Sequence, residues 1–209
     1  VALIGVSGAG KTTLLQTIAG LIKPTQGTLH LSFIDITPMS EESLTTFRIF
    51  NVGFIFQNYN LISSLTALEN VMFPMQLCGF TQEEAIKRSE TLLDRMGLKM
   101  RMEHLPVQLS AGEQQRVAIA RALAIDPPVI IADEPTANLD KQNSRFIGNL
   151  FEELRKQGKT IIVATHDDHL IQHAHRIIHM EAGKIISDEN VQPIDFASSL
   201  SEKGDSDEI

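Results

Sequence analysis

Residues 5 to 13 read GVSGAGKTT and have the composition of a phosphate-binding turn. Gly5 to Thr12 fit the pattern G-x-x-x-x-G-K-[ST], and the segment follows an apolar run and opens a helical pattern. Glycines in such a turn let backbone N–H groups approach phosphate oxygens at a helix N-terminus. Lys11 could reach the outer phosphates of a nucleotide, and the Thr12 hydroxyl could bind Mg²⁺. The alternative is a tight strand-to-helix turn without a ligand, which this context disfavours.

Two acids end a second apolar run, VIIADEPT at residues 129 to 136. Ligands of open α/β sheets bind at the carboxyl ends of strands, so Asp133 is placed to hold Mg²⁺ directly or through water. Glu134 could activate the attacking water as a general base. The two acids could instead be a helix-capping pair, but the polar residues that end other predicted strands argue against this.

Two further apolar runs also end in polar side chains. Gln57 follows GFIF, and His166 follows TIIVAT. A glutamine in this place can bind a metal or position water, and a histidine can contact a γ-phosphate or orient the water. Either residue alone would more often be structural. Together with the glycine-rich turn and the two acids, they predict one phosphoryl-transfer site.

A second helix start of similar type, LSAGEQQRVAIARAL, occupies residues 109 to 123. Ser110 and Glu113 fit a capping box. Helix starts of this kind also bind phosphate. The chain therefore has two candidate phosphate-binding helix ends that are far apart in the sequence.

The segment HDDHLIQHAHRIIH, from His166 to His179, could be read as a metal site. His169 and His173 have the i, i+4 spacing of a helical zinc-ligand pair. We favour an exposed polar helix followed by a strand, because the segment has no cysteine and its aspartates fit a helix start.

The remaining pattern predicts the elements that position these side chains. Apolar runs rich in β-branched residues predict strands at VALIG and at residues 51–56, 129–132, 160–164 and 176–180. Helices are predicted from Lys11 to Gly20 and over residues 113–125 and 141–156. This alternation predicts an α/β fold with a mostly parallel sheet.

Residues 58–110 interrupt the alternation. The stretch TQEEAIKRSETLLDRMG has a capping-box start at Thr81 and Glu84 and a glycine stop. We predict that residues 1–57 and 111–192 form an α/β nucleotide-binding core, with an inserted helical subdomain at 58–110. Residues 193–209 are acidic and rich in serine, which predicts a disordered tail.

The composition is typical of a soluble globular protein, with 209 residues that are 43% hydrophobic and 21% charged. The net charge of -8 argues against nucleic-acid binding, which usually needs a basic face. The single cysteine, Cys78, excludes an internal disulfide and fits a reducing compartment such as the cytoplasm. No apolar run approaches the roughly 20 residues that span a bilayer. Because Val1 lies inside a predicted strand, we expect the natural protein to begin upstream.

Taken together, these motifs resemble the ATP-binding cassette (ABC) ATPases from Val1 to about Ile186. They occur in the order GVSGAGKTT, Gln57, LSAGEQQR, IIADEPT, NLD at residues 138–140, and His166. The resemblance implies a P-loop NTPase core with an inserted helical subdomain, and Mg²⁺-dependent ATP hydrolysis. The residues it implies for nucleotide binding are Gly5, Ser7, Gly8, Ala9, Gly10, Lys11, Thr12, Thr13, Gln57, Ser110, Gly112 and Asp140. The implied metal ligands are Thr12, Gln57 and Asp133, and the implied catalytic residues are Glu134, His166, Gln57 and Lys11.

The resemblance also implies a reason for two phosphate-binding helix ends. Two ABC cassettes pack head to tail with ATP between them, so Ser110 would face the γ-phosphate held by the partner's P-loop. One helix end would then act in cis and the other in trans, across a twofold interface. Ser110 could instead only cap its own helix, and the two roles could also alternate between open and closed states.

A finer resemblance is to cassettes of the lipoprotein-releasing and macrolide-exporter type, carried by LTALENVMFPMQLCG, VGFIFQNYNLI and EPTANLD. It implies a homodimer at the cytoplasmic face of the cell membrane, beneath integral membrane subunits that dock near residues 57–77. The alternatives are a mechanical or regulatory cassette of the cell-division type, which does not transport, and a soluble cassette with no transport role.

Three features depart from the family pattern. Ala111 stands where glycine is usual, and a positive φ there would carry a steric cost. Ala9 replaces a common serine, which should be tolerated. The aromatic residue that usually stacks on adenine would lie upstream of Val1, so a preference for adenine rests on the resemblance alone.

Overall fold

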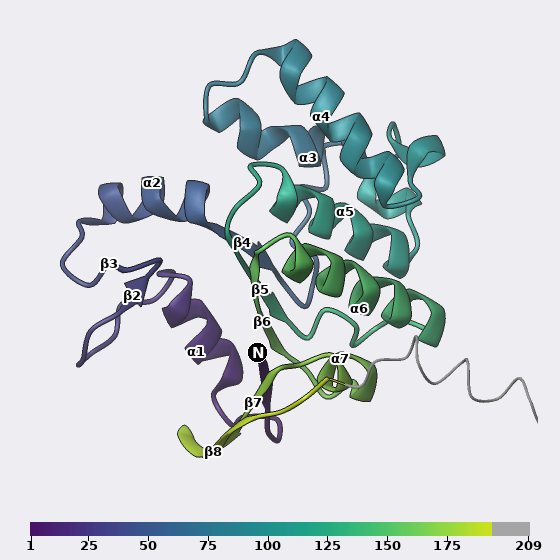
Figure 1. Ribbon diagram of the computed structural model, residues 1–209. Helices are drawn as coiled ribbons and strands as arrows, with labels where there is room; N and C mark the ends of the chain where they lie inside the picture. The colour runs from purple at the N-terminus through teal and green to yellow at the C-terminus, as the bar shows by residue number, and fades with distance from the viewer. Residues whose placement is uncertain (194–209) are drawn as a thin grey trace, which may run out of the picture.

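A six-stranded sheet lies at the centre of the structure, a computed structural model that describes residues 1–193 (Figure 1). The strands lie in the order β4 (Val52–Ile55), β5 (Val129–Asp133), β6 (Thr160–Ala164), β1 (Ala2–Ile4), β7 (Arg176–Glu181) and β8 (Lys184–Asn190). All neighbouring pairs are parallel except β7 and β8. The carboxyl ends of β4, β5, β6 and β1 therefore meet along one edge of the sheet.

Helices cover both faces of this sheet, as the alternation of strands and helices predicts. In β5, Val129 and Ile131 pack with the cluster that includes Leu15 of α1 (Lys11–Ile18). Ile130 and Ala132 pack with the opposite cluster, which includes helices α5 (Ala111–Leu123) and α6 (Lys141–Lys156). Alternate residues of a strand point to opposite faces, so a continuous apolar run is what a strand covered on both faces requires.

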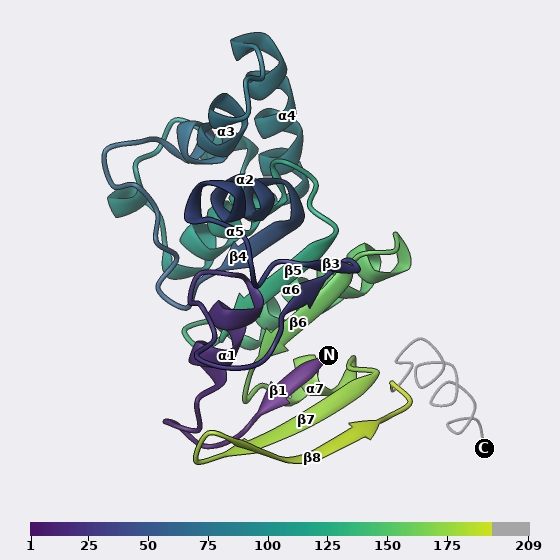
Figure 2. The same cartoon turned by 90° about the vertical axis from the view of Figure 1, so that its left-hand side faces the viewer.

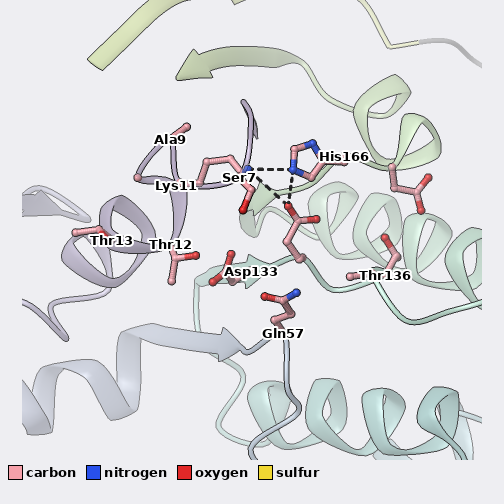
Figure 3. A pocket seen from close by; sticks show the side chains of 14 residues that line it. Ser7, Ala9, Lys11, Thr12, Thr13, Gln57, Asp133, Thr136 and His166 are labelled. Atoms are coloured by element: carbon pink, nitrogen blue, oxygen red, sulfur yellow. Dashed lines mark hydrogen bonds and ion pairs between the residues drawn. The ribbon is translucent and has the colours of Figure 1, made fainter. Parts of the chain in front are cut away.

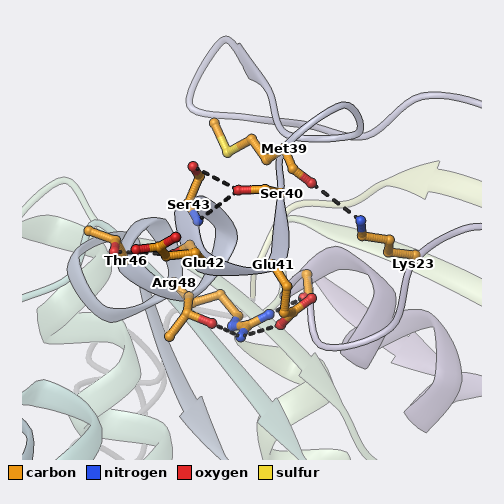
Figure 4. A network of polar contacts seen from close by, with 10 residues as sticks. Lys23, Met39, Ser40, Glu41, Glu42, Ser43, Thr46 and Arg48 are labelled. Atoms are coloured by element: carbon orange, nitrogen blue, oxygen red, sulfur yellow. Dashed lines mark hydrogen bonds and ion pairs between the residues drawn. The ribbon is translucent and has the colours of Figure 1, made fainter.

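On the α1 face, α2 (Glu41–Asn51) is joined to α1 by one arginine. Arg48 donates a hydrogen bond to the carbonyl of Gly20, just beyond α1, at 2.7 Å. It also contacts Glu41 on its own helix at 2.9 Å, as Figure 4 shows. Ser40 caps the start of α2 by accepting a hydrogen bond from the N–H of Ser43. The preceding segment holds a short hairpin of β2 (His30–Leu31) and β3 (Ile34–Asp35).

The predicted interruption of the alternation contains α3 (Ala67–Leu77), α4 (Gln82–Arg95) and two short 3₁₀ turns, η1 (Lys99–Arg101) and η2 (Pro106–Gln108). The two views show α3 and α4 extending away from the sheet, beside α5 (Figures 1 and 2). Capping boxes start α3 and α4, the latter at the predicted pair Thr81 and Glu84. Residues such as Met75 and Leu93 share one buried cluster with α5 and the sheet. The division into a core and an inserted subdomain stays a prediction.

Several boundaries and elements differ from the sequence-based expectation. The helix predicted at 113–125 runs instead from Ala111 to Leu123, because Ser110 caps it. The elements α2, β2, β3 and β8 were not predicted. No helix within residues 1–193 is long and apolar enough to cross a membrane. The predicted tail, 193–209, lies outside the described residues except for its first residue.

Candidate functional site

The glycine-rich turn joins β1 to α1, as the motif requires. Gly10 is the N-cap of α1 with a φ of 96°, a left-handed conformation that glycine adopts without a steric cost. Within residues 1–193, no side chain caps this helix end. Ala9 is buried and has no positive φ, so the change from serine is accommodated. The first N–H groups of α1 therefore remain available to an anion.

Lys11 brings a buried positive charge into this turn. Its side-chain amine donates a hydrogen bond to the carbonyl of Gly5 at 2.6 Å. The same nitrogen lies 3.1 Å from Nε2 of His166 and 3.8 Å from Oε1 of Glu134. Lys11 begins α1, which follows β1, whereas Glu134 and His166 follow β5 and β6. Figure 3 shows the side chains of Lys11 and His166 pointing toward one another.

Glu134 directly follows β5 and has a φ of 46°, which is uncommon outside glycine. Its N–H donates to the carbonyl of Ala164 at 2.9 Å, which fixes the residue beside the end of β6. Its Oε1 lies 3.2 Å from Nε2 of His166. Burial raises the pKa of the Glu134 carboxyl, and the nearby His166 and Lys11 partly oppose that rise. A raised pKa suits a group that must accept a proton near neutral pH.

These groups line one cavity of about 700 Å³. Sequence-predicted residues in its lining are Ser7, Gly8, Ala9, Gly10, Lys11, Thr12, Thr13, Gln57, Asp133, Glu134 and His166. Gln57 is exposed and lies beyond the end of β4, so four strand ends contribute to the cavity. Figure 3 shows Gln57 and Asp133 on the same side of the cavity as Thr12.

The donor groups in this cavity fit Mg²⁺. Asp133 is 6% exposed, and its Oδ1 is buried without a hydrogen-bond partner among the described residues. An unpartnered buried carboxylate oxygen is costly, so a ligand for it is expected. The hydroxyl of Thr12 and the amide oxygen of Gln57 line the same cavity. Mg²⁺ takes oxygen ligands, typically one or two carboxylates together with phosphate oxygens and water.

Three residues of the cavity lining were not singled out from the sequence. Thr136 and Ala137 follow Glu134, and Asp167 follows His166. Thr136 is the last residue of the motif IIADEPT, and the other two directly follow motif residues, so these positions are a signal that could have found them. Thr136 is 6% exposed and donates a hydrogen bond to the Asp167 carboxylate.

The second helix end, at the start of α5, lies outside this cavity. Ser110 and Gly112 do not line it, and neither do Gly5 and Asp140. The predicted capping box is present: the N–H of Ser110 donates to Glu113 at 2.8 Å, and the N–H of Glu113 donates to Ser110 Oγ at 3.3 Å. Ala111 begins the helix without a positive φ, so the steric cost considered for that position does not arise.

Asp140 caps the next helix, α6, through the N–H of Asn143 at 2.8 Å. The start of α5 approaches this cap closely: a Cβ added at Gly112 would lie 3.0 Å from Nδ2 of Asn143. A side chain at position 112 would therefore press on Asn143, which would have to shift by a few tenths of an ångström.

The histidine-rich segment forms a short helix followed by a strand, as predicted, but the helix is largely half-buried rather than exposed. Helix α7 (Asp168–Gln172) contains His169, His173 is its C-cap, and β7 follows. Within residues 1–193, no group of three or more His, Cys, Asp or Glu side chains could hold a metal ion.

The chain matches a known protein family and several of its members. The sequence profile of the family described as "ABC transporter" matches residues 1–137. The lipoprotein-releasing system ATP-binding protein LolD of Bacteroides fragilis is 46% identical over 187 residues, which are 89% of this chain and 87% of LolD. An uncharacterized ABC transporter ATP-binding protein of Mycobacterium bovis is 43% identical over 185 residues, which are 88% of this chain. The chain spans 56% of the length of that relative.

Solved structures of an ABC cassette also match this chain. The ATP-binding cassette MJ0796, in a dimeric post-hydrolysis state bound to ADP and Pi, matches with a TM-score of 0.87 and 40% sequence identity. The match covers 92% of this chain and 85% of that one. A second dimeric structure of MJ0796, described as a bacterial ABC transporter cassette, matches equally well. The mostly parallel sheet with helices on both faces is thus the cassette fold that the motifs predict.

Proposed function

Because the chain belongs to the ABC transporter family, we propose that it is the ATP-hydrolysing motor subunit of a membrane complex. The observation that carries this proposal is the meeting of Lys11, Asp133, Glu134 and His166 in one cavity at the edge of the sheet. Three different segments supply these groups, and the ordinary packing of an α/β fold does not require such a convergence. Their combination fits phosphoryl transfer from ATP to water.

Each side chain has a role that its position supports. The free N–H groups of α1 and the amine of Lys11 bind the phosphates of ATP. Asp133, Thr12 and Gln57 would hold Mg²⁺, which would neutralise phosphate charge when bound. Glu134 accepts a proton from the attacking water, whose oxygen bonds to the γ-phosphorus while the bond from that phosphorus to the bridging oxygen breaks. His166, 3.2 Å from Glu134, orients the base and the water.

The start of α5 is proposed to bind ATP in trans. Ser110 is exposed and lies outside the cavity of its own chain, so its phosphate must come from a second cassette. The dimeric form of MJ0796 supports such a pairing. Asp140, at the adjacent start of α6, would lie in the same interface. Two identical chains then complete two sites across a twofold axis.

Integral membrane subunits are proposed to dock beside α3. A groove of about 390 Å³ runs between α2, α3 and α5, and apolar side chains such as Phe54, Phe56 and Phe73 line it. Leu77, which also lines it, is 63% exposed, and exposed apolar patches of this kind mark interaction surfaces. The likeness to LolD supports a complex of the lipoprotein-releasing type, with the chain peripheral at the cytoplasmic face of the membrane.

The first test is Glu134→Gln. The amide cannot accept the proton, so the turnover rate should fall by about 10²- to 10⁴-fold, while ATP affinity stays within about twofold. The variant should accumulate as an ATP-bound dimer on a sizing column. Glu90→Gln, at an exposed position of α4, should leave turnover unchanged. Turnover near the wild-type rate in Glu134→Gln would show that Glu134 is not the base.

A further inference from the structure

The first turn of α6 contacts two regions that the proposed mechanism uses. Asn143 faces the start of α5, where Ser110 lies. The next residue, Ser144, faces the segment that follows β6 and carries His166. Neither residue lines the cavity, so neither has a place in the chemistry itself.

The side chain of Asn143 makes one hydrogen bond to α5 and a second to the cap of its own helix, α6. Its Oδ1 accepts one from Arg116 of α5, and its Nδ2 donates one to Asp140 at 2.8 Å. The guanidinium of Arg116 also lies 6.0 Å from the ring centre of Phe146 on α6. Gly112 also packs against the Asn143 side chain, so a shift of the start of α5 toward α6 would press on the first turn of α6.

Ser144 joins the same turn to Asp167. Its side chain is 4% exposed, and its hydroxyl donates a hydrogen bond to Oδ2 of Asp167. The other carboxylate oxygen of Asp167 accepts the N–H of His169 at 2.9 Å, and Thr136 donates to the carboxylate as well. Burial opposes ionisation of Asp167, but these hydrogen bonds outweigh it and hold its pKa below the usual range. The ionised carboxylate of Asp167 thus connects α6, α7 and the segment after β5 through hydrogen bonds.

Asp167 is the chain neighbour of His166, so its position sets that of His166. The backbone N–H of His166 donates to the Glu134 carboxylate, and the ring lies 3.2 Å from Oε1. The backbone of Asp167 is fixed in turn by its N–H, which donates to the Thr165 hydroxyl at 3.0 Å. Because Thr165 is fully buried and held in place, most movements of Asp167 would also move His166.

We infer that Ser144 and Asp167 are positioning residues that set where His166 stands against Glu134, and that Asn143 couples this position to the start of α5. The inference rests on the proposed function, in which Ser110 contacts ATP in trans and His166 acts in cis. When a phosphate binds at the start of α5, the resulting shift is transmitted through the first turn of α6 to the catalytic groups of the same chain. The coupling energy between two such regions is what a double-mutant cycle measures.

The kinetic test is Ser144→Ala, measured as steady-state ATP hydrolysis. The turnover rate should fall roughly three- to thirtyfold, with KM for ATP within about twofold, because Lys11 and Thr12 are untouched. In a His166→Ala background the same substitution should cause no further loss, because it acts through His166. Gln142→Ala is the matched control, since Gln142 is exposed on the same turn of α6.

A spectroscopic test does not depend on hydrolysis. The Cε1–H resonance of the His166 ring, assigned by its loss in His166→Ala, should shift in Ser144→Ala, in Asn143→Ala and in Asp167→Asn, and should stay in place in Gln142→Ala. An unshifted resonance in Ser144→Ala, or losses of turnover that multiply in the His166→Ala background, would overturn the inference. If the resonance shifts but the wild-type chain does not hydrolyse ATP, the positioning role stands and the proposed function fails.

Discussion

The starts of α1 and α5 are both small-residue helix ends, yet their polar groups are satisfied in opposite ways. At α1, Gly10 occupies the N-cap, and no side chain among the described residues caps the helix. At α5, Ser110 and Glu113 satisfy each other through three hydrogen bonds of 2.8 to 3.3 Å. The first end opens into a cavity with a buried lysine, and the second faces solvent. The first therefore has N–H groups open to a ligand in its own chain, whereas the second is complete as a helix cap and does not line that cavity.

The largest expected difference between the two ends is in ATP affinity. Lys11→Ala removes the positive charge from the α1 end, and a charge-assisted hydrogen bond of this kind corresponds to about tenfold to a hundredfold in affinity. Isothermal titration calorimetry with ATP and Mg²⁺ measures the loss. Lys87→Ala, at an exposed position of α4, should bind ATP normally. Equal affinity of Lys11→Ala and the wild type would contradict the assignment of the cis site to α1.

A smaller effect is expected at the α5 end, on stability rather than on binding. The backbone N–H of Ser110, together with Arg101, lowers the pKa of Glu113 to about 2. A carboxyl whose pKa is lower in the folded state stabilises the fold above its ordinary pKa, near 4.5, and loses that contribution as the pH falls toward 2. Glu113→Gln should therefore reduce the free energy of unfolding by roughly 0.5 to 1 kcal/mol at pH 7.

Urea unfolding at pH 7 and at pH 3 checks this prediction. The difference between the wild type and Glu113→Gln should shrink at pH 3, where the wild-type contribution has begun to disappear. A difference that is the same at both pH values would mean that the charge of Glu113 does not stabilise the capping box.

Much of the site could be predicted from the sequence, because its residues directly follow apolar strands. Asp133 and Glu134 end an uninterrupted run of buried residues, and parallel strands bring their carboxyl ends together. The capping boxes at Thr81 and Ser110 were also predictable, since both partners lie within one turn. The local spacing of residues was sufficient to predict a site residue or a helix cap wherever that residue lies at a strand end or at a helix start.

Other parts depend on contacts between distant segments. Strand β8 was not predicted because nearly all of its side chains are exposed, which leaves no apolar alternation. Helix α2 starts at Ser40 without the glutamate that completes a capping box, and of its residues only Leu44 is buried. The contact of Ser144 with Asp167 joins residues 23 positions apart, and nothing in either local sequence marks it.

The measurement that tests the contrast between the two helix ends most directly is the ATP affinity of monomeric Ser110→Arg. Ser40→Arg is the control, because the Ser40 side chain also accepts a hydrogen bond from a helix-start N–H and the residue lies outside the cavity. We predict that Ser110→Arg binds ATP within about twofold of the wild type. Combined with Glu134→Gln, it should abolish the ATP-bound dimer that Glu134→Gln alone accumulates. Loss of ATP binding by the monomer, with Ser40→Arg unaffected, would place Ser110 in the cis site and contradict the account.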